Sequence, residues 1–102
     1  MEPHRLAEVR SLAYHRAVAE RLAREPAILE RARARVRGWL RSTPAPHYAV
    51  AWNELLSRPL DEIGEFLNDD GERARELRQS TPFAGVLDPR ERWRLWRAAA
   101  GE

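Results

Sequence analysis

Residues 26–41 read PAILERARARVRGWLR, and this stretch decides the class of fold. Its apolar side chains recur at helical spacing within a sector of about 120°, and arginines fill the rest of the circumference. The proline suits the first turn of a helix, where its missing N–H is not needed. We therefore predict an amphipathic helix from Pro26 to Arg41. Its buried face would consist of Ile28, Leu29, Ala32, Val36, Trp39 and Leu40.

Helical periodicity continues on both sides of this stretch. Before it, apolar residues from about His4 to Arg24 cover more than one stripe, so that helix is either central in a bundle or shared with a partner. After it, prolines and Asp/Gly turns break the chain into short segments. We expect shorter helices at about 47–57, from Pro59, at about 71–79, and after Asp88-Pro89. No strand pattern competes with them. The sequence predicts an all-α fold, a compact bundle of five to six helices with short helices in its C-terminal half, as a single domain over residues 1–102.

The segment Ser80–Leu87 is unusually apolar for a connection between helices. Exposed loops are normally polar, so we expect Phe83 and Leu87 to insert into the core. The chain also holds four tryptophans. Their helical positions favour the core for Trp39 and Trp52.

Composition excludes several classes of function. There is no cysteine, which rules out disulfides, thiolate nucleophiles and cysteine zinc sites. No apolar run approaches the ~18 residues of a membrane span, and a cytoplasmic location is expected. All 18 basic residues are arginine, but the net charge is only +2. Charge is segregated: residues 1–41 carry a net +5, residues 42–80 a net −4 and residues 81–102 a net +1.

No catalytic or metal-binding motif is recognisable. His4, His15 and His47 are too far apart for a local metal motif. A calcium loop built around Gly71 fails, because Leu67 and Leu77 would stand at ligand positions. We predict that the chain is not an enzyme and carries no cofactor or metal.

Two groups of residues are candidates for binding a partner. Arg33, Arg37 and Arg41 form an i,i+4 row that could be a solvated face, contact an acidic protein or track phosphates. The second group is Trp93, Trp96 and Arg97, near the C-terminus among further arginines. Tryptophan and arginine are enriched at binding hot spots, so this group predicts a protein interface.

Residues 72–87, ERARELRQSTPFAGVL, resemble the helical region of small bacterial antitoxins from toxin–antitoxin operons. Residues 10–16 and 52–65 fit the same pattern, so the resemblance covers most of the chain. It implies an all-helical protein that neutralises a toxin by direct contact, without active-site residues of its own. Some of these proteins carry an added N-terminal helix-turn-helix, and we do not expect one in residues 1–102.

Taken together, these observations favour a protein-binding module, antitoxin-like, with a toxin as partner. Two alternatives stay open at this level. One is a nucleic-acid-binding accessory protein that uses the arginine row, and the other is a homo-oligomeric structural protein that dimerises through its first helix.

Overall fold

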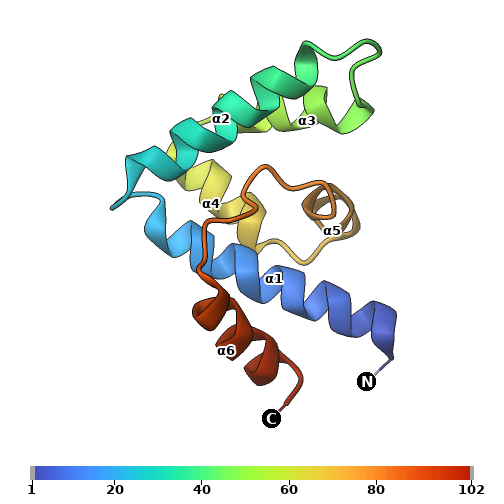
Figure 1. Cartoon of the computed structure of the whole chain (residues 1–102), viewed down its shortest axis with the longest axis vertical. Coiled ribbons are helices and arrows are strands. Elements are labelled where there is room, and N and C mark those ends of the chain that lie inside the picture. The colour runs from blue at the N-terminus through green and yellow to red at the C-terminus, as the bar shows by residue number, and fades with distance from the viewer. Residues whose placement is uncertain (1, 102) are drawn as a thin grey trace.

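The computed structural model describes residues 2–101, and these residues form six α-helices and no strand (Figure 1). The prediction of an all-α bundle of five to six helices is confirmed. The last four helices have 7 to 11 residues each, as expected for the C-terminal half. The helices are α1 (Pro3–Arg21), α2 (Pro26–Leu40), α3 (His47–Leu56), α4 (Leu60–Asn68), α5 (Glu72–Arg78) and α6 (Pro89–Ala99).

Prolines and acidic side chains define where the helices begin. Pro26 starts α2 and Pro89 starts α6, as the sequence predicts. The carboxylate of Asp88 accepts the N–H of Glu91 at 2.9 Å, so the expected N-cap of α6 is present. At α1 the cap is Glu2, whose two carboxylate oxygens accept backbone N–H groups of the first turn.

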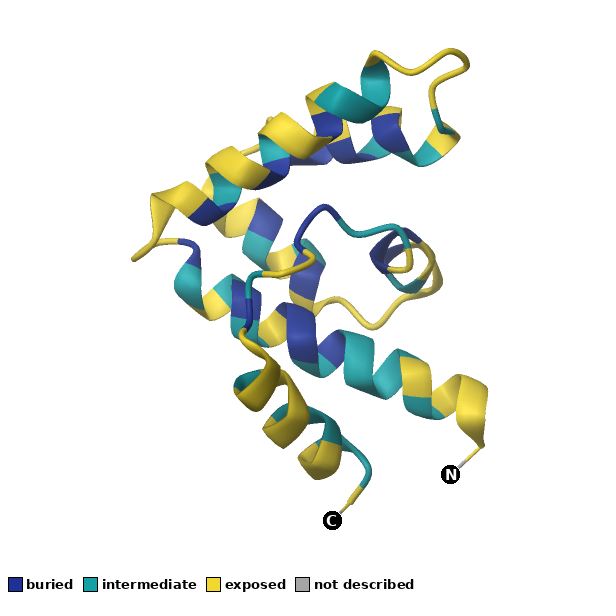
Figure 2. Ribbon diagram, viewed as in Figure 1, coloured by how far each residue is buried: buried dark blue, intermediate teal, exposed yellow. Residues whose placement is uncertain are grey.

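Helix α1 is the element around which the lower half of the molecule is built. It contacts α4, α5 and α6, whereas α2 packs against α3 (Figure 1). Of its residues, Leu12, Tyr14, His15 and Val18 are buried, and most of its N-terminal turns are exposed or half-buried (Figure 2). The broad apolar surface of this helix is therefore explained mainly by its central position.

The core is centred on Trp52, which is fully buried in α3. Its ring meets Phe66 of α4 and Phe83 edge-on, with ring centroids 5.9 and 6.1 Å away. Its indole Nε1–H donates to the carbonyl of Leu77 in α5 at 3.2 Å. One side chain thus joins two helices and a connecting segment to α3, and its expected place in the core is confirmed.

The segment 80–87 runs between the two halves of the molecule and holds them together. Phe83 and Leu87 are buried, which confirms that this connection belongs to the core. From α1, the hydroxyl of Tyr14 donates to the carbonyl of Phe83 at 2.7 Å. From α2, Nη1 of Arg35 donates to the carbonyls of Pro82 and Ala84 at 3.2 and 3.1 Å. The loop is therefore fixed from both sides, and it presents a defined surface to solvent beside α6.

Candidate functional site

Helix α6 lies on α1 without entering the core. None of its residues is buried, although Leu95 packs against the edge of the core (Figure 2). Its first turn is fastened to α1 by an ion pair between Glu91 and Arg21. The hydrogen bond from the Glu91 N–H stabilises the charged form of the Asp88 carboxyl and so holds its pKa below the ordinary value. The helix is therefore well anchored at its start, while most of its surface faces solvent.

A groove of about 390 Å³ opens between α1, α6 and the segment 80–87. That size lies within the range of small ligand sites and side-chain pockets. The two cations in its wall, Arg10 and Arg92, are not balanced there by any carboxylate of the described residues. The lining residues are Ala7, Arg10, Ser11, Tyr14, His15, Thr81, Ala84, Gly85, Arg92 and Trp96.

Trp96 and Arg92 form the α6 side of this groove, and Arg10 faces them from α1. The guanidinium carbons of Arg10 and Arg92 lie 5.4 and 5.2 Å from the Trp96 ring centroid, within the range of cation–π attraction. Arg92 reaches the ring from one turn earlier in α6, and Arg10 reaches it from α1. Nε of Arg10 is buried and has no acceptor among residues 2–101. A cation held against an aromatic ring with an unused donor is suited to an incoming anion.

His15 forms the floor of the groove and is 2% exposed. Its Nδ1 lies 2.7 Å from the Ser11 carbonyl, which can only accept, so Nδ1 carries the proton. Nε2 must then accept from the Thr81 hydroxyl, 2.8 Å away. Thr81 Oγ1 in turn accepts the Phe83 N–H at 3.0 Å. Both ring nitrogens are occupied: Nδ1 bonds within α1, and Nε2 ties α1 to the segment 80–87.

Burial lowers the pKa of His15 to about 4, and a hydrogen bond to the Ser11 carbonyl opposes that shift only in part. The imidazole is therefore neutral at pH 7. A base this weak is poorly matched to taking a proton from Thr81 at neutral pH, where an effective general base has a pKa near the working pH. We interpret the Thr81–His15 contact as structural support for the groove.

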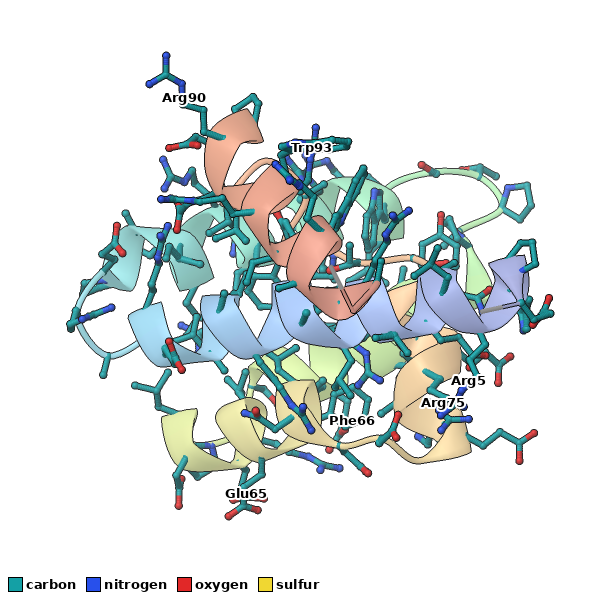
Figure 3. The ribbon with its side chains drawn as sticks, turned by 90° about the horizontal axis from the view of Figure 1, so that it is seen from below. Arg5, Glu65, Phe66, Arg75, Arg90 and Trp93 are labelled. Carbon is teal, nitrogen blue, oxygen red and sulfur yellow. The ribbon has the colours of Figure 1, made fainter. Side chains whose placement is uncertain are left out.

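The structure separates the two groups of predicted binding residues. Trp93, Trp96 and Arg97 lie on α6, whereas the arginine row lies on α2, at the opposite end of the molecule (Figure 1). Trp93 is 56% exposed and projects away from the body of the protein (Figure 3). Trp96 is half-buried in the groove wall, and Arg97 is exposed. Of the two tryptophans expected in the core, Trp52 is buried, whereas Trp39 is only half-buried and packs against the core from its edge.

The arginine row is not uniform. Nε and Nη2 of Arg33 donate to the carbonyl of Leu56 at 3.0 and 2.8 Å, so this side chain caps the C-terminus of α3. The side chains of Arg37 and Arg41 are exposed and make no hydrogen bond or ion pair with another of residues 2–101. One of the three members therefore already has a structural partner.

Sequence reasoning did not single out Arg10, and Arg92 entered only as one of the arginines near Trp93 and Trp96. The i,i+4 spacing of Arg92 and Trp96 is a signal that could have paired them. Arg10 has no such local signal, since it meets Trp96 only because α6 folds back onto α1. Within the described residues, no group of three or more His, Cys, Asp or Glu side chains could hold a metal ion. None of the helices combines the length and apolar character needed to cross a membrane.

No family model, curated protein or solved structure matches the chain. Within residues 72–87, the side chains of Ala74, Leu77, Phe83 and Leu87 are buried. That stretch therefore contributes largely to the core, and the site must be interpreted from the groove itself.

Proposed function

We propose that this protein is a protein-binding module whose partner docks on α6 and the groove beside it. The observation that supports the proposal is that two cations, Arg10 and Arg92, lie over the ring of Trp96 at a groove without a balancing carboxylate among the described residues. Trp93, exposed on the same helix, adds a large apolar side chain next to that groove. Aromatic and arginine side chains contribute the largest shares of binding energy in protein interfaces.

The burial pattern of α6 supports this assignment. A helix without a buried residue contributes little to the core, yet it carries two tryptophans. Exposing a large aromatic side chain to water is unfavourable by about 25 cal/mol per Å² of apolar surface. Covering Trp93 with a partner would recover that free energy.

The kind of partner follows from the antitoxin resemblance, and we propose a bacterial toxin in the cytoplasm. Neutralising a toxin requires only a surface of complementary shape and charge, and no chemistry by the neutralising chain. A cationic, aromatic groove would suit an acidic region of the toxin. Nucleic-acid binding through α2 and self-association are the competing outcomes of the experiment below.

The proposal is tested by photo-crosslinking in cells of the source organism. A benzophenone amino acid replaces Trp93 in one variant and Val50, 63% exposed on α3, in a matched control. We expect one protein to be crosslinked to position 93 and not to position 50. Adding Arg10→Gln to the position 93 variant should abolish this crosslink. The captured protein should arrest growth when expressed alone, and co-expression of this chain should restore growth.

Other outcomes contradict the proposal. Capture of a second copy of the chain from position 93 would indicate a homo-oligomer. Capture of nucleic acid, or equal capture from positions 93 and 50, would show that the α6 surface is not the specific protein-binding site. A captured protein that does not arrest growth would refute the toxin assignment alone.

A further inference from the structure

A second hollow lies next to the groove, on the other side of α1. It has a volume of about 190 Å³ and lies between α1 and α5. Ala7 and Ser11 line both hollows, so the two meet across α1 at these small side chains. Figure 3 shows α6, with Trp93, and α5, with Arg75, on opposite sides of α1. A chain lying over Ala7 could therefore enter both hollows.

Arg78 of α5 lines the second hollow and is a buried cation without a carboxylate partner. It is 3% exposed, and Nη1 donates to the backbone carbonyl of Asp69 at 2.5 Å. It forms no ion pair with any of residues 2–101. Burial lowers the pKa of Arg78, with Asp70 and Asp69 acting against this from a distance. Burying a charge in this way is costly unless an anion compensates it.

The carboxylate already present in the second hollow does not fill that role. Glu8 is paired with His4 at 3.2 Å and with Arg75 at 3.7 Å. Among residues 2–101, the buried side-chain nitrogens without an acceptor are Nε of Arg10 and Nε of Arg78. Each hollow is therefore lined by one arginine whose buried Nε has no acceptor, the half-buried Arg10 in the first and the buried Arg78 in the second.

We infer that the two hollows together bind one extended acidic segment of a protein partner, which crosses α1 over Ala7 and Ser11. One carboxylate of the segment pairs with Arg10 and Arg92, and a second pairs with Arg78. The inference rests on the proposed function, because it names the chemistry of the partner at the same groove. The larger hollow also takes an apolar side chain against Trp96.

Helix geometry sets the spacing of the two carboxylates. An α-helix with its side chains is about 10–12 Å across. An extended chain advances about 3.3 Å per residue, so the two acidic residues should stand about three to four positions apart. A continuous run of acidic residues is not required.

The test uses a capped octapeptide with phenylalanine at its second position and glutamate at its third and sixth. Three control peptides replace the first, the second or both glutamates with glutamine. Each is titrated into the ¹⁵N-labelled full chain, and amide, indole and arginine Nε resonances are followed by NMR. We expect shifts at Ala7, Ser11 and Trp96, and about tenfold weaker binding for each single glutamine peptide.

Arginine variants then assign each carboxylate. In Arg10→Gln, where only Arg92 remains, replacing the first glutamate should weaken binding less than in wild type, whereas replacing the second should weaken it as much as in wild type. Arg78→Gln should show the reverse, and Arg37→Gln on α2 serves as the charge-matched control. If Arg78→Gln does not fold, binding of the two single-glutamine peptides to the wild-type chain still shows whether each carboxylate contributes to affinity.

Equal binding of all four peptides, or the absence of shifts along α1, would overturn the inference. Its failure differs from failure of the proposed function. If a partner is still captured from position 93 while the peptides do not shift α1, only the acidic-segment inference is wrong. If the peptides bind as expected and no protein is captured, the proposed function is wrong and the anion-binding groove stands.

Discussion

Lowering the pH from 7 to 5 should destabilise this protein through His15, the floor of the groove. The imidazole is 2% exposed, and burial lowers its pKa to about 4. In the unfolded chain the same group titrates near 6.5. Between pH 6.5 and pH 4 the unfolded chain binds a proton at this imidazole and the folded protein does not. The free energy of unfolding therefore falls as the pH falls, and the His15 contribution levels off below about pH 4.

The size of the effect follows from the two pKa values. At about 1.36 kcal/mol per pKa unit, the complete effect is roughly 3 kcal/mol. Between pH 7 and pH 5, proton linkage gives a loss of about 2 kcal/mol from this one side chain. Since small domains have only about 5–15 kcal/mol of stability, the loss should be easy to measure.

The assay is urea denaturation at pH 7 and pH 5, followed by tryptophan fluorescence, for wild type and for His15→Gln. Glutamine can still accept from Thr81 but does not titrate, and the exposed His4 and His47 are present in both proteins. We expect the pH-dependent loss to be about 2 kcal/mol smaller in His15→Gln. Equal losses in the two proteins, or an NMR titration of folded His15 near pH 6.5, would refute the reasoning.

Two further predictions concern the contacts that support the groove and the arginine row. Tyr14→Phe should lower the free energy of unfolding by about 1–3 kcal/mol, because the buried carbonyl of Phe83 loses its donor; a change under 0.5 kcal/mol in a denaturant melt would contradict this. Arg33→Gln should cost about 1–2 kcal/mol through the lost bonds to Leu56, whereas Arg37→Gln should stay within about 0.5 kcal/mol. Equal melting behaviour of these two variants would show that the α3 cap contributes nothing.

Local signals in the sequence were sufficient for the helical architecture. Pro26 and the Asp88-Pro89 pair mark helix starts through backbone chemistry that depends only on neighbouring residues. The apolar character of Phe83 and Leu87 in a connecting segment correctly predicts that the segment is buried. Because these features depend on neighbouring residues and not on tertiary contacts, they can be predicted from the sequence alone.

The roles of the arginines could not be predicted in the same way. Along α2, Arg33 and Arg37 look alike, yet only Arg33 meets the end of α3, 23 residues further along the chain. Likewise, Arg10 meets Trp96 only because α6 returns to α1. Tertiary packing determines which group a flexible arginine on a helix surface contacts, and the periodicity of the sequence does not predict that contact.

The groove itself also depends on tertiary contacts. Its floor exists because His15 and Tyr14 of α1 hold the segment 80–87, more than 65 residues away in sequence. The three-residue spacing of Trp93 and Trp96 among arginines made them candidates for an interface, and that assignment remains a prediction. The groove beside these tryptophans could not be predicted from the sequence.

Binding of a partner through α6 and its groove is best tested by measuring the affinity of the captured partner. Isothermal titration calorimetry would compare wild type with Trp93→Ala and Arg10→Gln, and with Val50→Ala as the control on α3. We predict that Trp93→Ala raises Kd by about 30-fold, the equivalent of about 2 kcal/mol for an interface hot spot. Arg10→Gln should raise Kd by about tenfold and Val50→Ala by less than twofold. Folded Trp93→Ala and Arg10→Gln proteins that bind as tightly as wild type would contradict the account.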